Sequence, residues 1–265
     1  MRDEGISRRL REGAPAGVWL SMPSPTVAEV VAGTGTDFVV VDTEHTAASV
    51  ETVENAVRAV EAAPGDAVAL VRAAWNDPVR IKRLLDTGAA GVIAPQVETA
   101  AETESFVDAT RYPPAGDRGL AAGRASDYGA SLDDYYDTAA DRLATVVQVE
   151  SPRAVDNVAE ISAVDGLDAV FVGPADLSAS LGVFGEYDAE SFRSAVDTVL
   201  ADSTVPVGTL ATAPDQVDDW AARGFDFQAV AADTTALQRG VSASLARYAD
   251  TETGTENTEG GSGRS

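Results

Sequence analysis

The sequence predicts a single (β/α)₈ barrel of the TIM type, and three observations lead to that prediction. Short runs rich in Val, Ile and Leu alternate with segments of helical spacing along most of the chain. Eight such runs occur, each apolar almost throughout, as in strands that a parallel sheet buries on both faces. The chain has 265 residues, close to the roughly 250 that one such barrel needs. A doubly wound open sheet is the alternative.

The first half of the chain predicts four strands, each a β-branched or apolar run bounded by Gly, Pro or a charged residue. They are expected at Gly17–Leu20, Phe38–Asp42, Val68–Arg72 and Val92–Pro95. Helical spacing predicts an N-terminal helix within residues 2–13 and helices at Thr26–Ala32, Val50–Ala62, Pro78–Asp86 and Thr99–Thr110.

The alternation breaks between Tyr112 and Asp141, where Pro, Gly, Ala and Ser are frequent and Tyr135 and Tyr136 stand together. Loops of this length inside a compact domain tend to be functional lids or binding loops. We therefore expect this region to be an inserted loop that contributes to a binding site.

The second half of the chain resumes the alternation. Strands are expected at Thr145–Glu150, Ala169–Val172, Val205–Leu210 and Phe227–Val230, and helices at Pro152–Ile161, Ala189–Leu200, Pro214–Arg223 and Thr235–Tyr248. Leu237, Val241, Leu245 and Tyr248 form one apolar stripe on the last helix, which must therefore pack on something. Residues 1–249 are expected to form one domain, and residues 250–265, which have no apolar face, a disordered acidic tail.

The composition excludes several classes of protein. No apolar run approaches the roughly 20 residues that a membrane span requires, and the N-terminal segment is charged rather than signal-like, so a soluble, cytoplasmic protein is expected. The absence of cysteine excludes disulfides, thiolate metal sites and a cysteine nucleophile. There is no dinucleotide fingerprint, Walker loop or nucleophile elbow.

The charge is strongly negative. Asp and Glu number 43 against 19 Lys and Arg, which gives a formal net charge of −24. Such a surface disfavours nucleic acid and anionic membranes as partners, because both bind basic patches. Lys82 is the only lysine, and an acidic, lysine-poor surface resembles that of halophilic proteins, in which high salt screens the self-repulsion.

Two acidic residues follow predicted strands. Glu150 ends the run Thr145–Glu150, and Asp176 follows Ala169–Val172 within a Gly-Pro-Ala-Asp sequence. The carboxyl ends of parallel strands form one rim, where ligands bind. Two carboxylates there repel each other unless a cation or a proton lies between them, and such oxygen ligands suit Mg²⁺ or Mn²⁺. The alternative is that Glu150 merely precedes a helix cap at Ser151 and that Asp176 belongs to a turn.

Two other candidates lie at the same rim. His45, the only histidine, follows the second predicted strand, and its ordinary pKa suits proton transfer near neutral pH. Arg72 ends the third strand, where a guanidinium has to meet a buried anion. A structural histidine and a salt bridge across the barrel mouth are the alternatives. Lys82 lies among charged residues on a predicted outer helix, which argues against a lysine Schiff base.

Six motifs occur in order along residues 14–248. They are Asp42-Thr43-Glu44-His45; Val71-Arg72 with Trp75-Asn76-Asp77-Pro78; Leu84-Leu85-Asp86-Thr87-Gly88; Arg111-Tyr112-Pro113-Pro114 with Arg118-Gly119; Gln148-Val149-Glu150; and Gly173-Pro174-Ala175-Asp176-Leu177-Ser178. The last two are the most specific. Together the motifs resemble those of the HpcH/HpaI metal-dependent pyruvate aldolases, within the phosphoenolpyruvate- and pyruvate-binding barrels.

The resemblance implies a divalent metal, Mg²⁺, Mn²⁺ or Co²⁺, bound by Glu150 and Asp176. Gln148 would lie beside the bound oxo-acid. Arg72 would stabilise the ketone oxygen as it becomes an enolate. His45 would transfer the proton of the 4-hydroxyl group, with Asp86 as its orienting partner, although from spacing alone Asp86 is a solvated residue in the last turn of a helix.

The resemblance also implies a substrate pocket. The turn Gly173-Pro174-Ala175-Asp176 would bind the substrate carboxylate through the amides of Ala175 and Asp176. Trp19 and Leu210, at the ends of the first and seventh strands, would line the pocket. The region 112–141 would contribute to the aldehyde side.

The reaction implied is the reversible cleavage of a 4-hydroxy-2-oxo acid into pyruvate and an aldehyde. The family further implies a homohexamer, a trimer of dimers, in which the C-terminal helix packs on a neighbouring subunit or is exchanged with it. Two alternatives are open: a citrate lyase β-like or malyl-CoA lyase-type enzyme, and a non-catalytic barrel that binds oxo-acids. The first would bind coenzyme A, for which the chain shows no basic patch.

Overall fold

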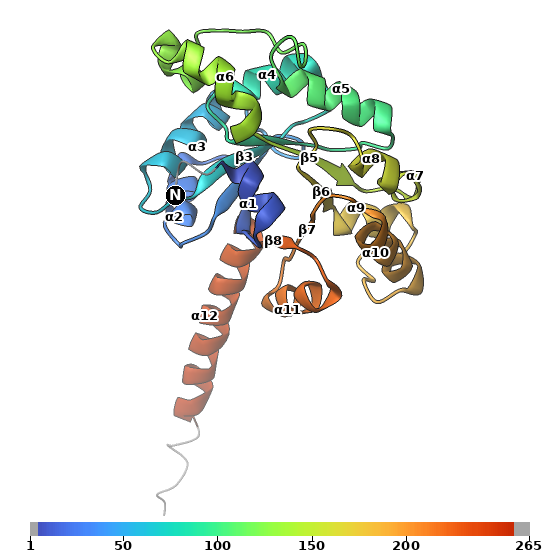
Figure 1. The fold of residues 1–265 in the computed structure, drawn as a ribbon. Coiled ribbons are helices and arrows are strands. Elements are labelled where there is room, and N and C mark those ends of the chain that lie inside the picture. The colour runs from blue at the N-terminus through green and yellow to red at the C-terminus, as the bar shows by residue number, and fades with distance from the viewer. Residues whose placement is uncertain (1–4, 257–265) are drawn as a thin grey trace, which may run out of the picture.

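The computed structural model describes residues 5–256, which form a closed barrel of eight parallel strands in chain order (Figure 1). Each strand pairs with the next, and β8 pairs with β1. The strands are β1 Ala16–Leu20, β2 Phe38–Asp42, β3 Val68–Arg72, β4 Gly91–Ala94, β5 Ala144–Val149, β6 Ala169–Val172, β7 Val207–Leu210 and β8 Phe227–Ala232. The predicted barrel is confirmed, and its closure rules out the open sheet.

Helices surround the strands, and several begin at a sequence-encoded cap. Ser24, Ser49, Asp77, Thr99 and Ser151 each accept a hydrogen bond from the backbone N–H three residues on. The helices up to the insertion are α1 Ile6–Glu12, α2 Pro25–Ala32, α3 Val50–Ala62, α4 Pro78–Leu85 and α5 Ala100–Thr110. After it come α7 Pro152–Asp156, α8 Val158–Ser162, α9 Pro174–Ser180, α10 Glu190–Asp202 and α11 Pro214–Arg223. The helix expected at 152–161 is divided at Asn157, and α9 lies outside the helix ranges expected from the sequence.

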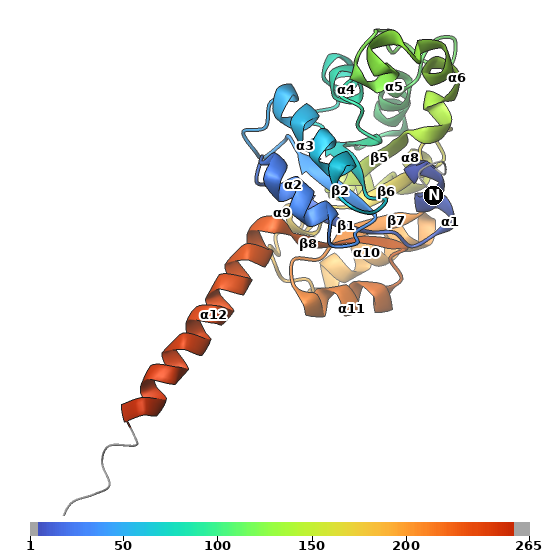
Figure 2. The same cartoon turned by 90° about the vertical axis from the view of Figure 1, so that its left-hand side faces the viewer.

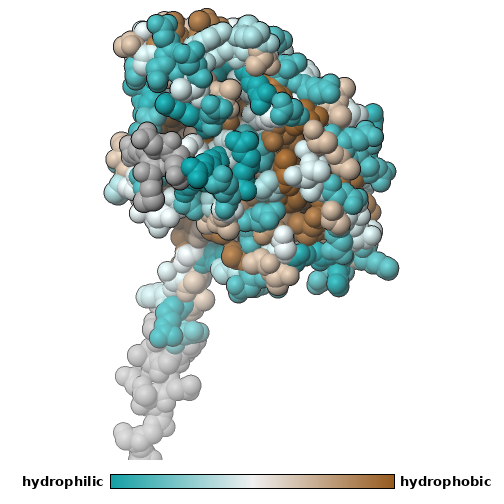
Figure 3. All heavy atoms as spheres, in the orientation of Figure 1, coloured by the Kyte–Doolittle hydropathy of each residue, from teal (hydrophilic) through white to brown (hydrophobic). Residues whose placement is uncertain are grey.

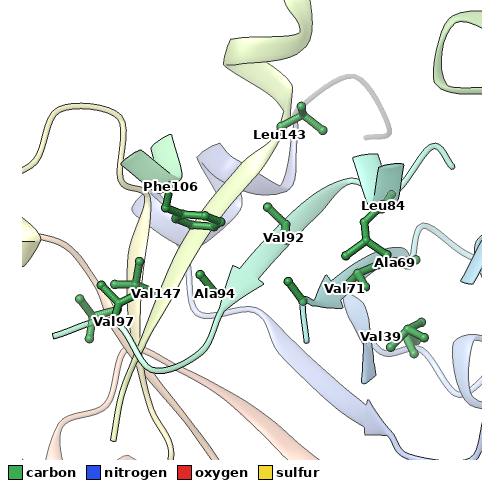
Figure 4. Packing of buried hydrophobic residues seen from close by; sticks show 14 of the residues in the cluster. Val39, Ala69, Val71, Leu84, Val92, Ala94, Val97, Phe106, Leu143 and Val147 are labelled. Carbon is green, nitrogen blue, oxygen red and sulfur yellow. The ribbon is translucent and has the colours of Figure 1, made fainter. Parts of the chain in front are cut away.

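The alternation of side chains along the strands sorts them into two packed layers. Val39 and Val41 of β2 face outward and join the cluster between strands and helices, whereas Phe38 and Val40 face the barrel lumen. Figure 4 shows part of the outer layer, with Phe106 of α5 among side chains of β4 and β5. The parity of a residue in its strand therefore decides whether it can reach the lumen.

Aromatic rings fill the lumen below the carboxyl ends of the strands. Phe227 lies 6.3 Å from Phe38 and 6.1 Å from Phe171, and Phe171 lies 5.6 Å from Trp19, measured between ring centroids. Gly17 makes this possible, because a Cβ there would lie 2.0 Å from the ring of Phe38. The lumen is thus a solid core, and Trp19 is its upper layer.

The predicted loop at 112–141 is only partly a loop. A 3₁₀ segment, Arg124–Gly129, and a helix, α6 Leu132–Arg142, occupy its second half. Asp133 and Asp134 lie in the first turn of α6 and Arg142 in the last, which suits the helix dipole. The helix was missed because its apolar face is small, with Ala139 as its buried residue.

The insertion also lies at the opposite end of the barrel from the expected site. It connects α5 to β5, and a segment that follows a helix returns to the start of the next strand. Accordingly Arg124 contacts the Thr87 carbonyl and the Glu61 carboxylate near the helix ends that precede β3 and β4. Within one chain, the interpretation of this region as a lid or as part of the aldehyde side is therefore wrong.

Arg118 anchors the insertion. Its side chain is 0% exposed and lies over the ring of Tyr112 at 4.7 Å and that of Tyr135 at 5.6 Å. Its Nη2 donates to Asp86 Oδ1 at 2.9 Å, and Asp86 is 26% exposed. Asp86 is therefore the partly exposed partner of a buried guanidinium rather than a free residue on the helix surface.

Helix α12, Asp233–Glu256, projects away from the barrel in both views (Figures 1 and 2). The predicted apolar stripe on it is exposed: Leu237 57%, Val241 51%, Leu245 64% and Tyr248 64%. The helix continues past Tyr248, so residues 250–256, the start of the predicted disordered tail, are helical. The rest of that predicted tail, residues 257–265, lies outside the described residues.

Hydrophilic residues cover most of the face shown in Figure 3, in keeping with the acidic composition. Within residues 5–256, no helix combines the length and the apolar character needed to cross a membrane.

The ion pair of Arg118 and Asp86 leads to an asymmetric stability prediction. Asp86→Ala leaves a fully buried guanidinium without its carboxylate and should lower the free energy of unfolding by about 3 kcal/mol. Arg118→Met should cost less, about 1–2 kcal/mol, because a thioether fills the space between the rings and the partly exposed Asp86 is hydrated. Urea denaturation followed by circular dichroism measures both. An Arg118→Met cost equal to or above that of Asp86→Ala would contradict this account.

Candidate active site

Strand parity brings the predicted residues together at the carboxyl end of the barrel. Arg72 lies two positions after Leu70, which faces the lumen, so it faces the same way. Gln148 and Glu150 lie two and four positions after the lumen residue Val146 and also face that way. Trp19 and Phe171 are lumen residues themselves, and Gly173 continues the parity of Phe171. Residues from β1, β3, β5 and β6 therefore converge on one rim.

Arg72 lies at the centre of this rim. Its Nε and Nη2 donate to Asp42 Oδ1 and Oδ2 at 2.9 and 2.7 Å, a bidentate pair between residues that are register partners on β2 and β3. Its Nη1 lies 2.8 Å from Glu44 Oε2, an ion-pair contact without hydrogen-bond alignment. The guanidinium is stacked over Trp19 at 4.9 Å. The sequence left two interpretations of Arg72 open: that it binds a buried anion, and that it forms a salt bridge across the barrel mouth. The contact with Asp42 fits both.

The surroundings of Arg72 shift the pKa values of its partners in opposite directions. The pKa of Asp42 lies below its ordinary value because hydrogen bonds and the charge of Arg72 outweigh the burial of the carboxyl group. Burial raises the pKa of Glu44, against the opposing charge of Arg72. Asp42 is thus the fixed anionic partner, and Glu44 is held less firmly in its ionised form.

Glu150 is 4% exposed, and its two oxygens have different environments. Oε2 accepts a hydrogen bond from Gln96 Nε2 at 2.6 Å, whereas the buried Oε1 has no hydrogen-bond partner. Burial, and then the nearby charges of Asp176 and Glu44, raise the pKa of Glu150 to about 7. A buried carboxylate with an unpartnered oxygen and acidic neighbours is poised to bind a proton or a cation.

Asp176 approaches from the next strand. It lies in the first turn of α9, after the N-cap Gly173 and the buried Pro174. The N–H groups in the first turn of a helix have no intrahelical acceptor, so the amides of Ala175 and Asp176 are available to an anion. A side chain at Gly173 would crowd Glu150, because a Cβ there would lie 3.1 Å from its Oε1 atom.

These residues fit a divalent metal that shares its ligands with water and substrate. Within residues 5–256, no cluster of three or more His, Asp or Glu residues forms a complete metal cage, and no ion pair joins Glu150 or Asp176 to a basic side chain. The unpartnered oxygens are Glu150 Oε1 and Gln148 Oε1, and Gln148 is itself buried. Hard oxygen donors of this kind suit Mg²⁺ or Mn²⁺, which usually retain several waters.

His45 lies on the loop after β2, next to this cluster. Its side chain is 65% exposed, and its Nε2 lies 3.8 Å from Glu44 Oε2. The predicted pairing of His45 with Asp86 is not made within one chain. Asp86 follows the last turn of α4, which returns to the start of β4 at the opposite end of the barrel, and there it binds Arg118.

Two further predicted residues lie in or next to the lumen on this side of the barrel. Trp19 is buried beneath Arg72, and Leu210 ends β7 on the lumen parity of Gly208, half-buried. Three residues were not singled out from the sequence: Asp42, Glu44 and Gln96. Asp42 could have been found from the sequence, because it is the last residue of an apolar strand, β2, just as Arg72 is the last residue of β3. Gln96 had none, because it follows the strand in an ordinary turn sequence.

Comparisons with known proteins agree with this geometry. A sequence profile described as HpcH/HpaI aldolase/citrate lyase matches residues 15–239. A 4-hydroxy-2-oxo-heptane-1,7-dioate aldolase from Salmonella arizonae is 40% identical over 246 residues, 90% of this chain and 92% of that protein.

Solved structures show the same relationship. An HpcH/HpaI aldolase/citrate lyase family protein from Burkholderia cenocepacia is 36% identical with a TM-score of 0.88, over 92% of this chain and 98% of that one. The citrate synthase SbnG is 30% identical with a TM-score of 0.83, over 94% of this chain and 99% of that one. The resemblance carried by the motifs is confirmed: the chain belongs to the HpcH/HpaI aldolase/citrate lyase family of enzymes.

Proposed function

We propose that this enzyme is a divalent-metal-dependent aldolase that reversibly cleaves a 4-hydroxy-2-oxo acid into pyruvate and an aldehyde. The main support is the charge distribution at the rim, where Asp42 and Glu44 contact the guanidinium of Arg72, and where burial and the nearby charge of Asp176 raise the pKa of Glu150. The likeness to an aldolase of a 4-hydroxy-2-oxo acid over most of the chain supports the same reaction class.

Glu150 and Asp176 would hold the ion, with Gln148 beside it. A divalent ion bound there supplies a Lewis acid for the 2-oxo group of the substrate. The amides of Ala175 and Asp176 would bind the substrate carboxylate, and the metal and Arg72 would bind its 2-oxo group. Binding at both points orients the substrate before any bond breaks.

Arg72 would stabilise the enolate oxygen that forms on cleavage. Asp42 engages two of the five N–H groups of a guanidinium, and the remaining ones lie on Nη1 and Nη2. The bidentate contact and the stacking on Trp19 hold the guanidinium plane, so its charge needs no reorganisation when the oxygen becomes negative.

His45 would accept the proton of the 4-hydroxyl group as the bond between C3 and C4 breaks. The bonding electrons pass to the enolate of pyruvate, and a proton delivered to C3 completes the product. An imidazole suits both transfers near neutral pH. The exposed position of His45 places it on the solvent side of the rim, where the aldehyde would leave.

A second candidate is a related carbon–carbon bond reaction that uses a larger oxo-acid or an acyl thioester. The likeness to a citrate synthase, at 30% identity, is the observation that favours it. The citrate lyase β-like and malyl-CoA lyase alternatives belong to the same group of reactions, and the assay below separates them from a pyruvate aldolase.

We also propose that the enzyme is a homo-oligomer, with hexamers as the family resemblance implies. A second copy of the chain is expected to cover the exposed stripe Leu237, Val241, Leu245 and Tyr248, because an apolar helix face of this length is unfavourable in water. Light scattering after size exclusion should give a multiple of the chain mass, and Leu237→Glu/Leu245→Glu should shift it toward the monomer. A monomeric wild-type protein would contradict this proposal.

The activity test measures pyruvate release from a panel of 4-hydroxy-2-oxo acids, with and without EDTA. Activity should disappear on chelation and return with Mg²⁺, Mn²⁺ or Co²⁺. Asp176→Asn and Arg72→Ala should each lower kcat by at least about 100-fold, because they remove an ion ligand and the oxyanion partner.

Two controls make the activity test specific. Thermal unfolding should show that Asp176→Asn remains folded, and Lys82→Met should leave the rate unchanged, since no lysine participates. Activity that survives EDTA, or that appears only with acyl-CoA esters, would rule out the proposed aldolase.

Metal binding should depend on pH through Glu150. Its pKa of about 7 means that the carboxyl group holds a proton at pH 6 and has lost it at pH 8. An ion has to displace that proton, so the affinity for Mn²⁺ should fall about tenfold from pH 8 to pH 6. Isothermal titration calorimetry measures this change. An affinity for Mn²⁺ that does not change between pH 6 and pH 8 would contradict the assigned role of Glu150.

A further inference from the structure

Gln96 has an unusual backbone conformation at the rim. It follows β4 and Pro95, with a φ of 55°, in the left-handed region that non-glycine residues seldom adopt. Its side chain is exposed, although Pro95 and Val97 beside it are buried. Such a conformation costs free energy and persists where the surroundings require it.

What Gln96 contacts is the buried carboxylate of Glu150. Its Nε2 donates to Glu150 Oε2 at 2.6 Å, and its backbone N–H points at the same oxygen at 3.4 Å. The left-handed turn directs both donors to one acceptor. The other oxygen, Oε1, is left buried and without a partner.

Glu150 is confined from a second direction by Gly173. The Cβ that Gly173 lacks would lie 3.1 Å from both the Cγ and the Oε1 of Glu150. The carboxylate therefore has Gln96 on its Oε2 side and the backbone of Gly173 against its Oε1 side. Its orientation is set by its neighbours before any ligand binds.

We infer that Gln96 is a positioning residue for the metal site: it fixes the carboxylate of Glu150 through Oε2 so that Oε1 is presented to the ion. This inference rests on the proposed function, since it assumes that Glu150 is a ligand. Hydrogen-bond partners of metal ligands set ligand orientation, and their loss typically weakens metal binding about 10–100-fold. Gln96 acts through Glu150 and does not touch the substrate or the ion.

The test uses two substitutions with different effects on the backbone. Gln96→Gly removes the amide and relieves the left-handed strain, whereas Gln96→Leu keeps the bulk and the strain but removes the donor. The matched control is Gln216→Leu, which removes a rim amide that accepts from Thr212 N at 2.8 Å and has no hydrogen bond to Glu150.

The readout is the Kd for Mn²⁺ of the full-length protein at pH 8, measured from the free-ion signal in electron paramagnetic resonance, with thermal unfolding of the metal-free protein alongside. Both Gln96 variants should raise Kd about tenfold while Gln216→Leu leaves it unchanged. The Gln96→Gly protein should unfold at the wild-type temperature or above.

The outcomes separate this inference from the function on which it rests. If the wild-type protein binds Mn²⁺ and both Gln96 variants bind it equally well, the inference is overturned and the proposed aldolase stands. A weaker affinity in Gln96→Leu alone also overturns it, because both variants lack the donor and the apolar Leu side chain would then be responsible. Absence of Mn²⁺ binding in the wild-type protein overturns both.

Discussion

The site depends on an imbalance of charge at the mouth of the barrel. Four carboxyl groups meet there, and the guanidinium of Arg72 is bound by Asp42 and contacted by Glu44. Glu150 and Asp176 are close enough for their charges to interact, and among the described residues neither forms an ion pair with a basic side chain. In a buried setting this repulsion is relieved by a proton or by a cation. The raised pKa of Glu150 represents the first solution, and a divalent ion would be the second.

The geometry of the strands produces this imbalance from ordinary local rules. Alternate residues of each strand face the lumen. A polar residue that comes two positions after the last apolar lumen-facing residue of a strand therefore lies at the rim. Phe38, Phe171 and Phe227 fill the lumen below, and Trp19 closes it beneath Arg72. The same packed aromatic column that stabilises the barrel therefore excludes water from beneath the site and holds the guanidinium in place.

Most of the fold and part of the site could be predicted from the sequence, because both depend on periodicity. β2, β3 and β6 have the predicted bounds, and Glu150, Asp176, Arg72 and Gln148 lie at one rim as their positions after apolar runs implied. Helix α6 was missed because its apolar face is small. Gln96 was missed because its role depends on a left-handed φ and on a carboxylate 54 positions away, and neither leaves a pattern in the sequence.

The distance of Asp86 and of the insertion from the site of their own chain has a single physical origin. In this fold, a segment that follows a strand lies at the end of the barrel that carries the active site. A segment that follows a helix lies at the opposite end. Asp86, Arg118 and the region 112–141 all follow helices, and there the buried guanidinium of Arg118 pairs with Asp86. An acidic residue in a motif is therefore insufficient to assign a catalytic role. Its place relative to the preceding element decides whether its charge can reach the substrate of its own chain.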